Sequence, residues 1–172
     1  MVRGLIRDEG FAPEDIIVVI NGEGGLDDAI LAAQVQIEHL EENLGPAGGF
    51  RAGLVAAAAR GAQWAYLCED DIGLFDLPTP RVESALSRLS ELPQEVAESV
   101  GGVVAYGRML DPRTGRTRPA VPKPDSDAFV EVDAAAWGAT LVNCDLVRRN
   151  ILPDTDSCVE QNVGVRWAGS GS

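Results

Sequence analysis

Three consecutive acids, Glu69, Asp70 and Asp71, follow a short apolar run at residues 64–68. Negative charges placed together at the end of a hydrophobic strand repel one another unless something compensates for them. Hard divalent cations prefer carboxylate oxygens as ligands, and a metal held in this way can bridge a diphosphate. Alternatively, Glu69 and Asp70 are solvated loop acids and Asp71 caps a turn.

A glycine-rich turn, "NLGPAGGFRAG" at residues 43–53, precedes an alanine-rich segment. Gly45, Gly48 and Gly49 let the backbone approach a ligand closely, and the N-terminus of a helix follows. The spacing matches neither GxGxxG nor a Walker A loop. The turn therefore indicates either a ligand contact or close packing of a helix on a strand.

Helices and strands alternate in the first two thirds of the chain. The sequence predicts the last turns of a helix in residues 2–10, which Gly10 can close, then a doubly buried strand at 15–20, a turn at 21–25 and a short helix after it. Residues 35–40 fit a strand, or part of a longer helix that reaches residue 42. An alanine-rich helix ending at Gly61 and a strand at 64–68 complete this part.

The later part of the chain is richer in predicted strands. A helix is expected between Pro80 and Pro93, and strands within residues 101–110, 129–133 and 137–143. Residues 111–127 read as a loop or hairpin, and residues 144–150 as a short helix. We therefore expect one α/β domain over residues 1–167, with a mostly parallel mixed sheet, helices on both faces and a flexible tail at 168–172.

The positions of the two polar clusters suggest a site. One apolar strand ends at Asn21 and Gly22, and the other ends at the three acids. Ligands of open α/β sheets bind beyond the carboxyl ends of the strands. If both strands lie in one parallel sheet, the two clusters share an edge.

Composition restricts the class of protein. The 172 residues include 14 Lys and Arg against 27 Asp and Glu, which gives a formal net charge of −13 and argues against nucleic acid or anionic membrane as a partner. Three cysteines without a CxxC pair suggest a reduced, cytoplasmic protein. No apolar run is long enough to span a membrane, and no signal peptide is recognised at the N-terminus.

Three segments taken in order, "IIVVINGEGG", "ENLGPAGGFRAGLVAAAARGAQWAYLCEDDI" and "VDAAAWGATLV", resemble the inverting family 2 glycosyltransferases of the GT-A fold. The nearest branch is the rhamnosyl- and galactofuranosyl-transferase-like one. The resemblance covers nearly the whole chain and is most specific over residues 43–72. It implies transfer of a sugar from a nucleoside diphosphate sugar to an acceptor hydroxyl, with Mn²⁺ or Mg²⁺ as cofactor.

The resemblance also implies roles for individual residues. Asp71 would bind the metal on the donor diphosphate, and Glu160 would be the general base, with Arg166 matching the family's arginine. The residues implied to contact the nucleotide sugar are Asn21, Gly22, Asn43, Gly49, Arg51, Glu69, Asp70, Trp137 and Gly138.

Departures from the family pattern point to a second hypothesis, a non-catalytic GT-A domain that acts as a nucleotide-sugar-binding or partner module. Ile20 stands where the family usually has an acid, residues 159–162 lack the paired acids, and His39 lies too early to be the family's metal-binding histidine. The match begins inside the family's first helix, so its first strand is expected to be missing. We expect that a homodimer or a partner chain supplies that strand.

Overall fold

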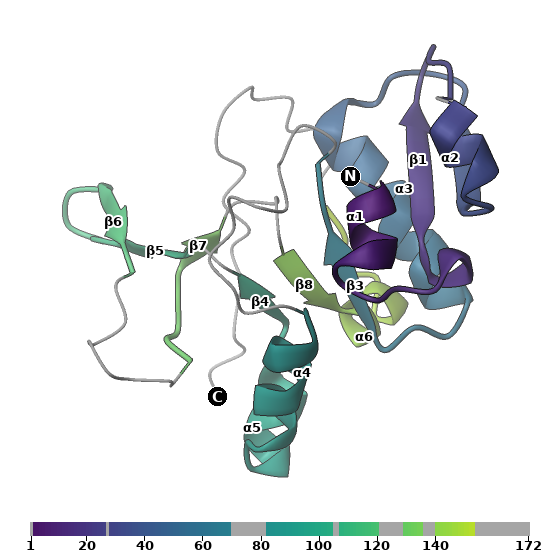
Figure 1. The fold of residues 1–172 in the computed structure, drawn as a ribbon. Helices are drawn as coiled ribbons and strands as arrows, with labels where there is room; N and C mark the ends of the chain where they lie inside the picture. Colours follow the sequence, from purple (N-terminus) through teal and green to yellow (C-terminus); the bar gives the residue numbers. More distant parts are fainter. Residues whose placement is uncertain are drawn as a thin grey trace.

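The computed structural model describes residues 2–26, 28–69, 82–104, 107–120, 129–135 and 140–153. The elements of this part of the chain are, in order, α1 (Val2–Arg7), a 3-10 turn η1 (Pro13–Asp15), β1 (Ile17–Asn21), α2 (Asp28–Ala32), β2 (Gln36–Leu40), α3 (Gly45–Ala59), β3 (Trp64–Leu67), α4 (Val82–Ser90), α5 (Gln94–Ser99), β4 (Gly102–Val104), β5 (Gly107–Leu110), β6 (Thr117–Pro119), β7 (Ala134–Ala135), β8 (Thr140–Asn143) and α6 (Cys144–Arg148). Figure 1 shows their arrangement.

The N-terminal unit is a two-stranded parallel sheet, β1–β2, with α3 packed against it. Residues 36–40 form a strand, so the alternative of a longer helix there is wrong. The alternation of half-buried and exposed residues along β2 fits a strand covered on one face. The 15-residue helix α3 ends before Gly61, whose φ of +85° favours glycine.

A second sheet, with the strand order β3–β8–β4, carries most of the core. On one face, Leu67 and Val142 pack with Leu54 of α3 and Val147 of α6. On the other face, Leu141 packs against helix α4. Leu54 and Cys144 are the largest side chains that are fully buried among the described residues. Helices therefore cover both faces of this sheet.

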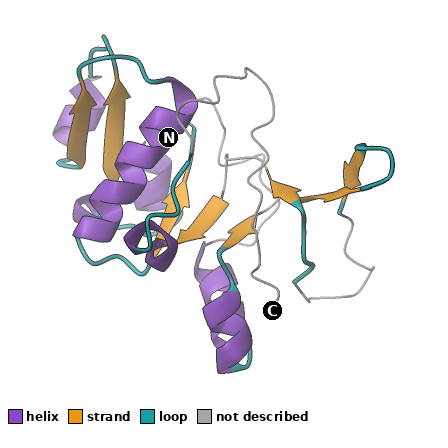
Figure 2. Cartoon of the chain, turned by 180° about the vertical axis from the view of Figure 1, so that it is seen from behind, coloured by secondary structure: helices purple, strands orange, loops and turns teal. Residues whose placement is uncertain are grey.

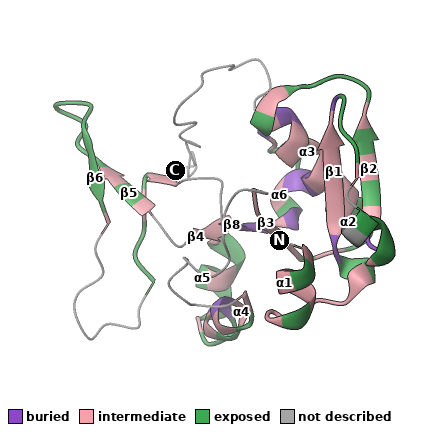
Figure 3. Cartoon of the chain, turned by 45° about the horizontal axis from the view of Figure 1, so that its top comes forward, coloured by how far each residue is buried: buried purple, intermediate pink, exposed green. Residues whose placement is uncertain are grey.

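The third sheet, β6–β5–β7, lies apart from the other two in the views of Figures 1 and 2. Figure 3 shows that its strands are half-buried or exposed, without buried residues. An Asp111–Gly115 turn joins β5 to β6, in agreement with the predicted loop or hairpin.

The predicted mostly parallel sheet of the GT-A fold is wrong. Among the described strands, only β1 and β2 pair in parallel, whereas both three-stranded sheets are antiparallel. The physical reason lies in two places: β8 inserts antiparallel between β3 and β4, and β1 forms no ladder with β3. The parallel strands predicted to be neighbours therefore belong to separate small sheets.

Smaller differences concern the boundaries of elements. The strand predicted within residues 101–110 is two strands, β4 and β5, in different sheets. Residues 129–133 are not a strand, and the short strand β7 follows them. The sequence pattern does not predict helix α5, because Pro93 marks the end of the preceding helix, yet Pro93 also stands immediately before the first turn of α5.

Candidate functional site

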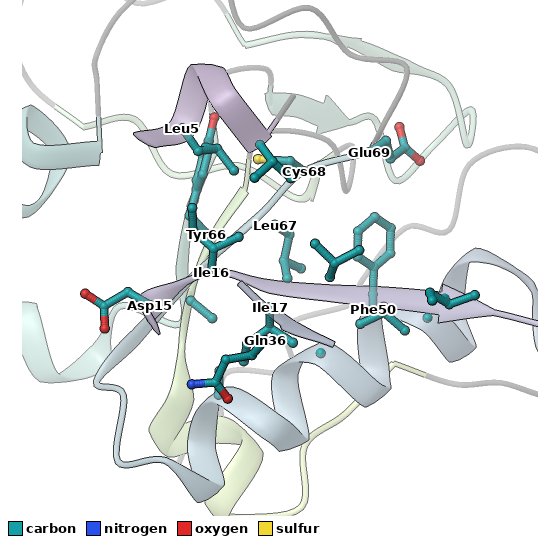
Figure 4. Close-up of a pocket in the computed structure, with 18 of the residues that line it drawn as sticks. Leu5, Asp15, Ile16, Ile17, Gln36, Phe50, Tyr66, Leu67, Cys68 and Glu69 are labelled. Atoms are coloured by element: carbon teal, nitrogen blue, oxygen red, sulfur yellow. The ribbon is translucent and has the colours of Figure 1, made fainter. Parts of the chain in front are cut away.

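A cavity of about 1560 Å³ lies between β1 and β3 and is the main candidate site among the described residues. All of β1 and all of β3 line it, together with residues from α1 and α3 (Figure 4). No ladder joins the two strands across it. The cavity therefore occupies the place where a continuous sheet would have another strand.

β1 and β3 run in the same direction along the cavity. The end of β1 meets the start of α3, since Asn21 bonds to Leu44 and Gly45. The end of α3 leads through four residues into β3, and Leu67, at the end of β3, packs against Leu54 in the middle of α3. Both strands are therefore antiparallel to α3, and their carboxyl ends open at the same end of the cavity, although they do not lie in the single parallel sheet that this expectation assumed.

Four of the predicted binding residues gather at that end. Asn21, Asn43, Gly49 and Glu69 all line the cavity. Figure 4 shows Glu69 just beyond Cys68, where β3 has ended. The structure thus brings together residues from three segments of the sequence that are separated by about twenty residues each.

The Asn21 side chain is engaged by the protein itself. Its Nδ2 donates to the Gly45 carbonyl at 2.6 Å, and its Oδ1 accepts the Leu44 N–H at 2.8 Å. Both polar atoms of the amide therefore hold the turn that begins α3. This arrangement makes Asn21 a residue that positions the turn.

Gly22 acts through close backbone contact. Its φ is +90°, and an added Cβ would lie 2.8 Å from the Asn43 nitrogen. Only glycine fits there without a shift of the backbone. Gly22 is not among the lining residues of the cavity, and it sets the distance between the turn after β1 and the turn before α3.

Arg51 lies on a different side of α3. Its guanidinium donates to the Pro153 carbonyl at 3.4 Å. The residue lines a second, shallower hollow on α3 and β2, and it does not line the cavity between β1 and β3. The structure therefore separates Arg51 from the other predicted nucleotide-binding residues.

The remaining predicted site residues, Asp70, Asp71, Trp137, Gly138 and Glu160, lie outside the described residues. Within the described residues, no group of three or more His, Cys, Asp or Glu could hold a metal ion. Among the described residues that line the cavity, only Glu69 brings a carboxylate to its carboxyl end. One carboxylate is too few to bind a divalent cation tightly, so the predicted Mn²⁺ or Mg²⁺ site depends on Asp70 and Asp71.

Tyr66 and Cys68 are features that the sequence analysis missed. Both point to the same side of β3 because they alternate along it, and Figure 4 shows Tyr66 directed toward α1 beside Leu5. Burial raises the pKa of the Cys68 thiol to about 12. Burial, and then the neighbouring Cys68, raise the pKa of Tyr66. At neutral pH both groups are therefore uncharged and suit a mainly apolar cavity wall.

Comparison of the chain with family models, with curated proteins and with solved structures gave no match. No helix among the described residues has the length and apolar character needed to cross a membrane.

Proposed function

We propose that this chain is a glycosyltransferase that transfers a sugar from a nucleoside diphosphate sugar to an acceptor hydroxyl, with inversion. One observation carries the proposal. Asn21, Asn43, Gly49 and Glu69, which match the family's nucleotide-binding motifs, come from separate segments yet line the same end of one cavity. The carboxyl ends of parallel strands are where nucleotides bind in α/β proteins.

The proposed roles follow from the chemistry of each group. The N-terminus of α3 would face the diphosphate through the Ala47 N–H and the helix dipole, because the Gly45 N–H already donates to the Asn43 side chain and Pro46 has no N–H. Asp71 would hold Mn²⁺ or Mg²⁺, which supplies positive charge to the leaving diphosphate. Glu160 would accept the proton of the acceptor hydroxyl.

Calorimetric titration tests the donor site. UDP and dTDP are titrated into the protein with and without Mn²⁺, in wild type and in two variants, Asp71→Ala and Asp76→Ala. We expect metal-dependent binding of one nucleotide that is lost in Asp71→Ala and kept in Asp76→Ala. Absence of binding by both nucleotides, or equal binding in wild type and Asp71→Ala with metal present, would contradict the proposal.

A non-catalytic nucleotide-sugar-binding or partner module is the second candidate. The observation that favours it is the open space between β1 and β3, the two strands whose ends would form the donor site. A catalytic site needs its groups held rigidly, and separate small sheets hold them less firmly than one continuous sheet. Metal-dependent nucleotide binding without sugar transfer or donor hydrolysis would support this candidate.

A further inference from the structure

His39 is the only histidine of the chain, and its ring contacts the turn that follows β1. It stands near the end of β2, opposite Ile20 of β1. Its Nε2 lies 3.2 Å from the Gly22 carbonyl oxygen in a partly buried contact. A carbonyl oxygen only accepts hydrogen bonds, so the contact requires a proton on Nε2 of the ring.

This contact stands where the parallel ladder between β1 and β2 ends. The Gly22 N–H donates to the Leu40 carbonyl at 3.2 Å. If the ladder continued, the Glu42 N–H would bond to the Gly22 carbonyl. Among the described residues no backbone N–H makes that bond, and the His39 ring takes its place. Gly22 is buried, so both of its backbone groups need partners, and β2 supplies both.

The other polar side chains of β2 make contacts elsewhere. Gln36 donates to the Glu14 carbonyl at the start of the strand. Glu38 accepts from Arg60, which follows the end of α3. Of the polar side chains of β2, only His39 therefore reaches the turn after β1.

The turn that His39 holds lies against the turn that begins α3. An added Cβ on Gly22 would be 2.8 Å from the Asn43 nitrogen, so the two turns are in close contact. Asn43 lines the cavity, and its Oδ1 accepts the Gly45 N–H at 2.9 Å. A displacement of Gly22 should therefore also displace Asn43.

We propose that His39 is a positioning residue of the candidate donor site. Its ring holds the Gly22 carbonyl, and Gly22 fixes the place of Asn43 at the carboxyl end of the cavity. His39 is exposed and is not among the residues that line the cavity, so it acts through Gly22. The inference rests on the proposed function for the role of Asn43 toward the nucleotide, whereas the hold of the ring on the turn is testable without it.

Hydrogen exchange in three variants tests the hold on the turn. The side chain of glutamine can bring an amide N–H close to the position of Nε2, whereas asparagine is one methylene shorter and alanine has no donor. In His39→Ala and His39→Asn we expect exchange at the Gly22 and Leu44 amides to quicken at least ~3-fold, and in His39→Gln to stay near the wild-type rate. The Val18 amide, at the start of the ladder, is the internal control.

Nucleotide affinity tests the positioning role. In calorimetric titration with Mn²⁺, His39→Ala and His39→Asn should bind the nucleotide at least ~3-fold more weakly, and His39→Gln should bind it as the wild type does. Ile37→Ala is the matched control, because Ile37 lies on the same face of β2, is 39% exposed and does not line the cavity. It should keep the wild-type affinity.

The tautomer of the ring is tested in the wild-type protein without any variant. Because the chain has one histidine, the imidazole ¹⁵N resonances in an NMR spectrum belong to His39. At alkaline pH, where the ring is neutral, we expect the Nε2–H tautomer. The Nδ1–H tautomer would overturn the proposal, since Nε2 could not then donate to Gly22.

Other results would also overturn it. One is an unchanged exchange rate at Gly22 and Leu44 in His39→Ala, and another is His39→Gln behaving like His39→Ala. Faster exchange in His39→Ala with unchanged nucleotide affinity would limit the ring to support of the turn and overturn the positioning role. Absence of nucleotide binding in the wild-type protein would overturn the proposed function and the donor-site part of this inference, while exchange would still decide whether His39 holds the turn.

Discussion

The Asn21 side chain fastens the end of β1 to the start of α3, donating to the Gly45 carbonyl at 2.6 Å while it accepts the N–H of the preceding residue, Leu44. Family resemblance assigns Asn21 to the nucleotide, but both of its polar atoms are used within the protein. The same turn carries Asn43 and Gly49, which line the cavity. Loss of the Asn21 amide should therefore disturb the candidate donor site by loosening the turn that carries Asn43 and Gly49.

Asn21→Ala should lower the free energy of unfolding by about 1–3 kcal/mol, because it removes one half-buried and one exposed hydrogen bond and leaves the Gly45 carbonyl without this donor. Urea denaturation followed by circular dichroism measures the change. Gln94→Ala is the control, since it removes one exposed side-chain bond to Glu98 and should change stability by no more than about 0.5 kcal/mol. Equal stability of Asn21→Ala and wild type would show that the amide contributes nothing to the turn.

Two glycines with similar backbone angles allow the stability cost of steric contact to be measured separately from the cost of backbone strain. Gly22 (φ +90°) and Gly10 (φ +74°) both adopt a conformation that favours glycine, but only at Gly22 would a Cβ meet other atoms within 4 Å. Gly10→Ala should therefore cost about 1 kcal/mol. Gly22→Ala should cost clearly more, because the backbone nitrogen of Asn43 must also move. Equal losses of stability in urea denaturation would contradict the close contact.

The local elements were largely predictable from the sequence. The apolar run before Asn21, the alanine-rich segment ending at Gly61 and the apolar run at residues 64–67 all form the predicted elements, because local propensity and hydrophobic pattern agree there. They also place Asn21 and Glu69 at the same end of one cavity, but not at the edge of one parallel sheet, which was the predicted arrangement.

The sheet topology was not predictable in the same way. The run "TLVN" of β8 is compatible with either strand direction, and its antiparallel pairing with β3 and β4 is decided by long-range contacts. The lack of pairing between β1 and β3 is likewise decided by long-range contacts and not by the local sequence. Arg51 and Asn21 show a further limit of prediction from motifs. A residue that matches a motif position can instead pack elsewhere on the protein, as Arg51 does, or hold a turn, as Asn21 does.

Glu160→Gln tests the proposed catalytic base. If the protein transfers sugar, this variant should reduce turnover by ~10²–10⁴ and leave donor binding nearly unchanged, as expected for loss of a general base. Glu131→Gln, at an exposed position, is the matched control and should keep wild-type turnover. Initial rates at saturating donor, together with calorimetric donor affinity, give both quantities. Wild-type turnover in Glu160→Gln would assign the base to another residue.

Cys68 should react slowly with alkylating reagents. Its thiol pKa of about 12, raised by burial, leaves very little thiolate at pH 8. Labelling of Cys68 by iodoacetamide should be on the order of 10²–10³ slower in the folded protein than in urea, as measured for the Cys68 peptide by mass spectrometry. Comparable rates in the two states would mean that the thiol is not held in an apolar environment.

The raised pKa of Cys68 also predicts how stability depends on pH. The pKa is higher in the folded protein than its usual value of 9.0, so folding favours the neutral thiol. This contribution is fully present below pH 9 and is lost as the pH rises from about 9 toward 12, because the unfolded chain ionises first. Tyr66, whose ordinary pKa is 10.0 and is also raised, adds a similar loss at higher pH. The difference in unfolding free energy between wild type and Cys68→Ala, measured at pH 8.0, 9.0 and 10.0, should therefore shrink with rising pH, and a difference that stays constant would contradict the buried, neutral thiol.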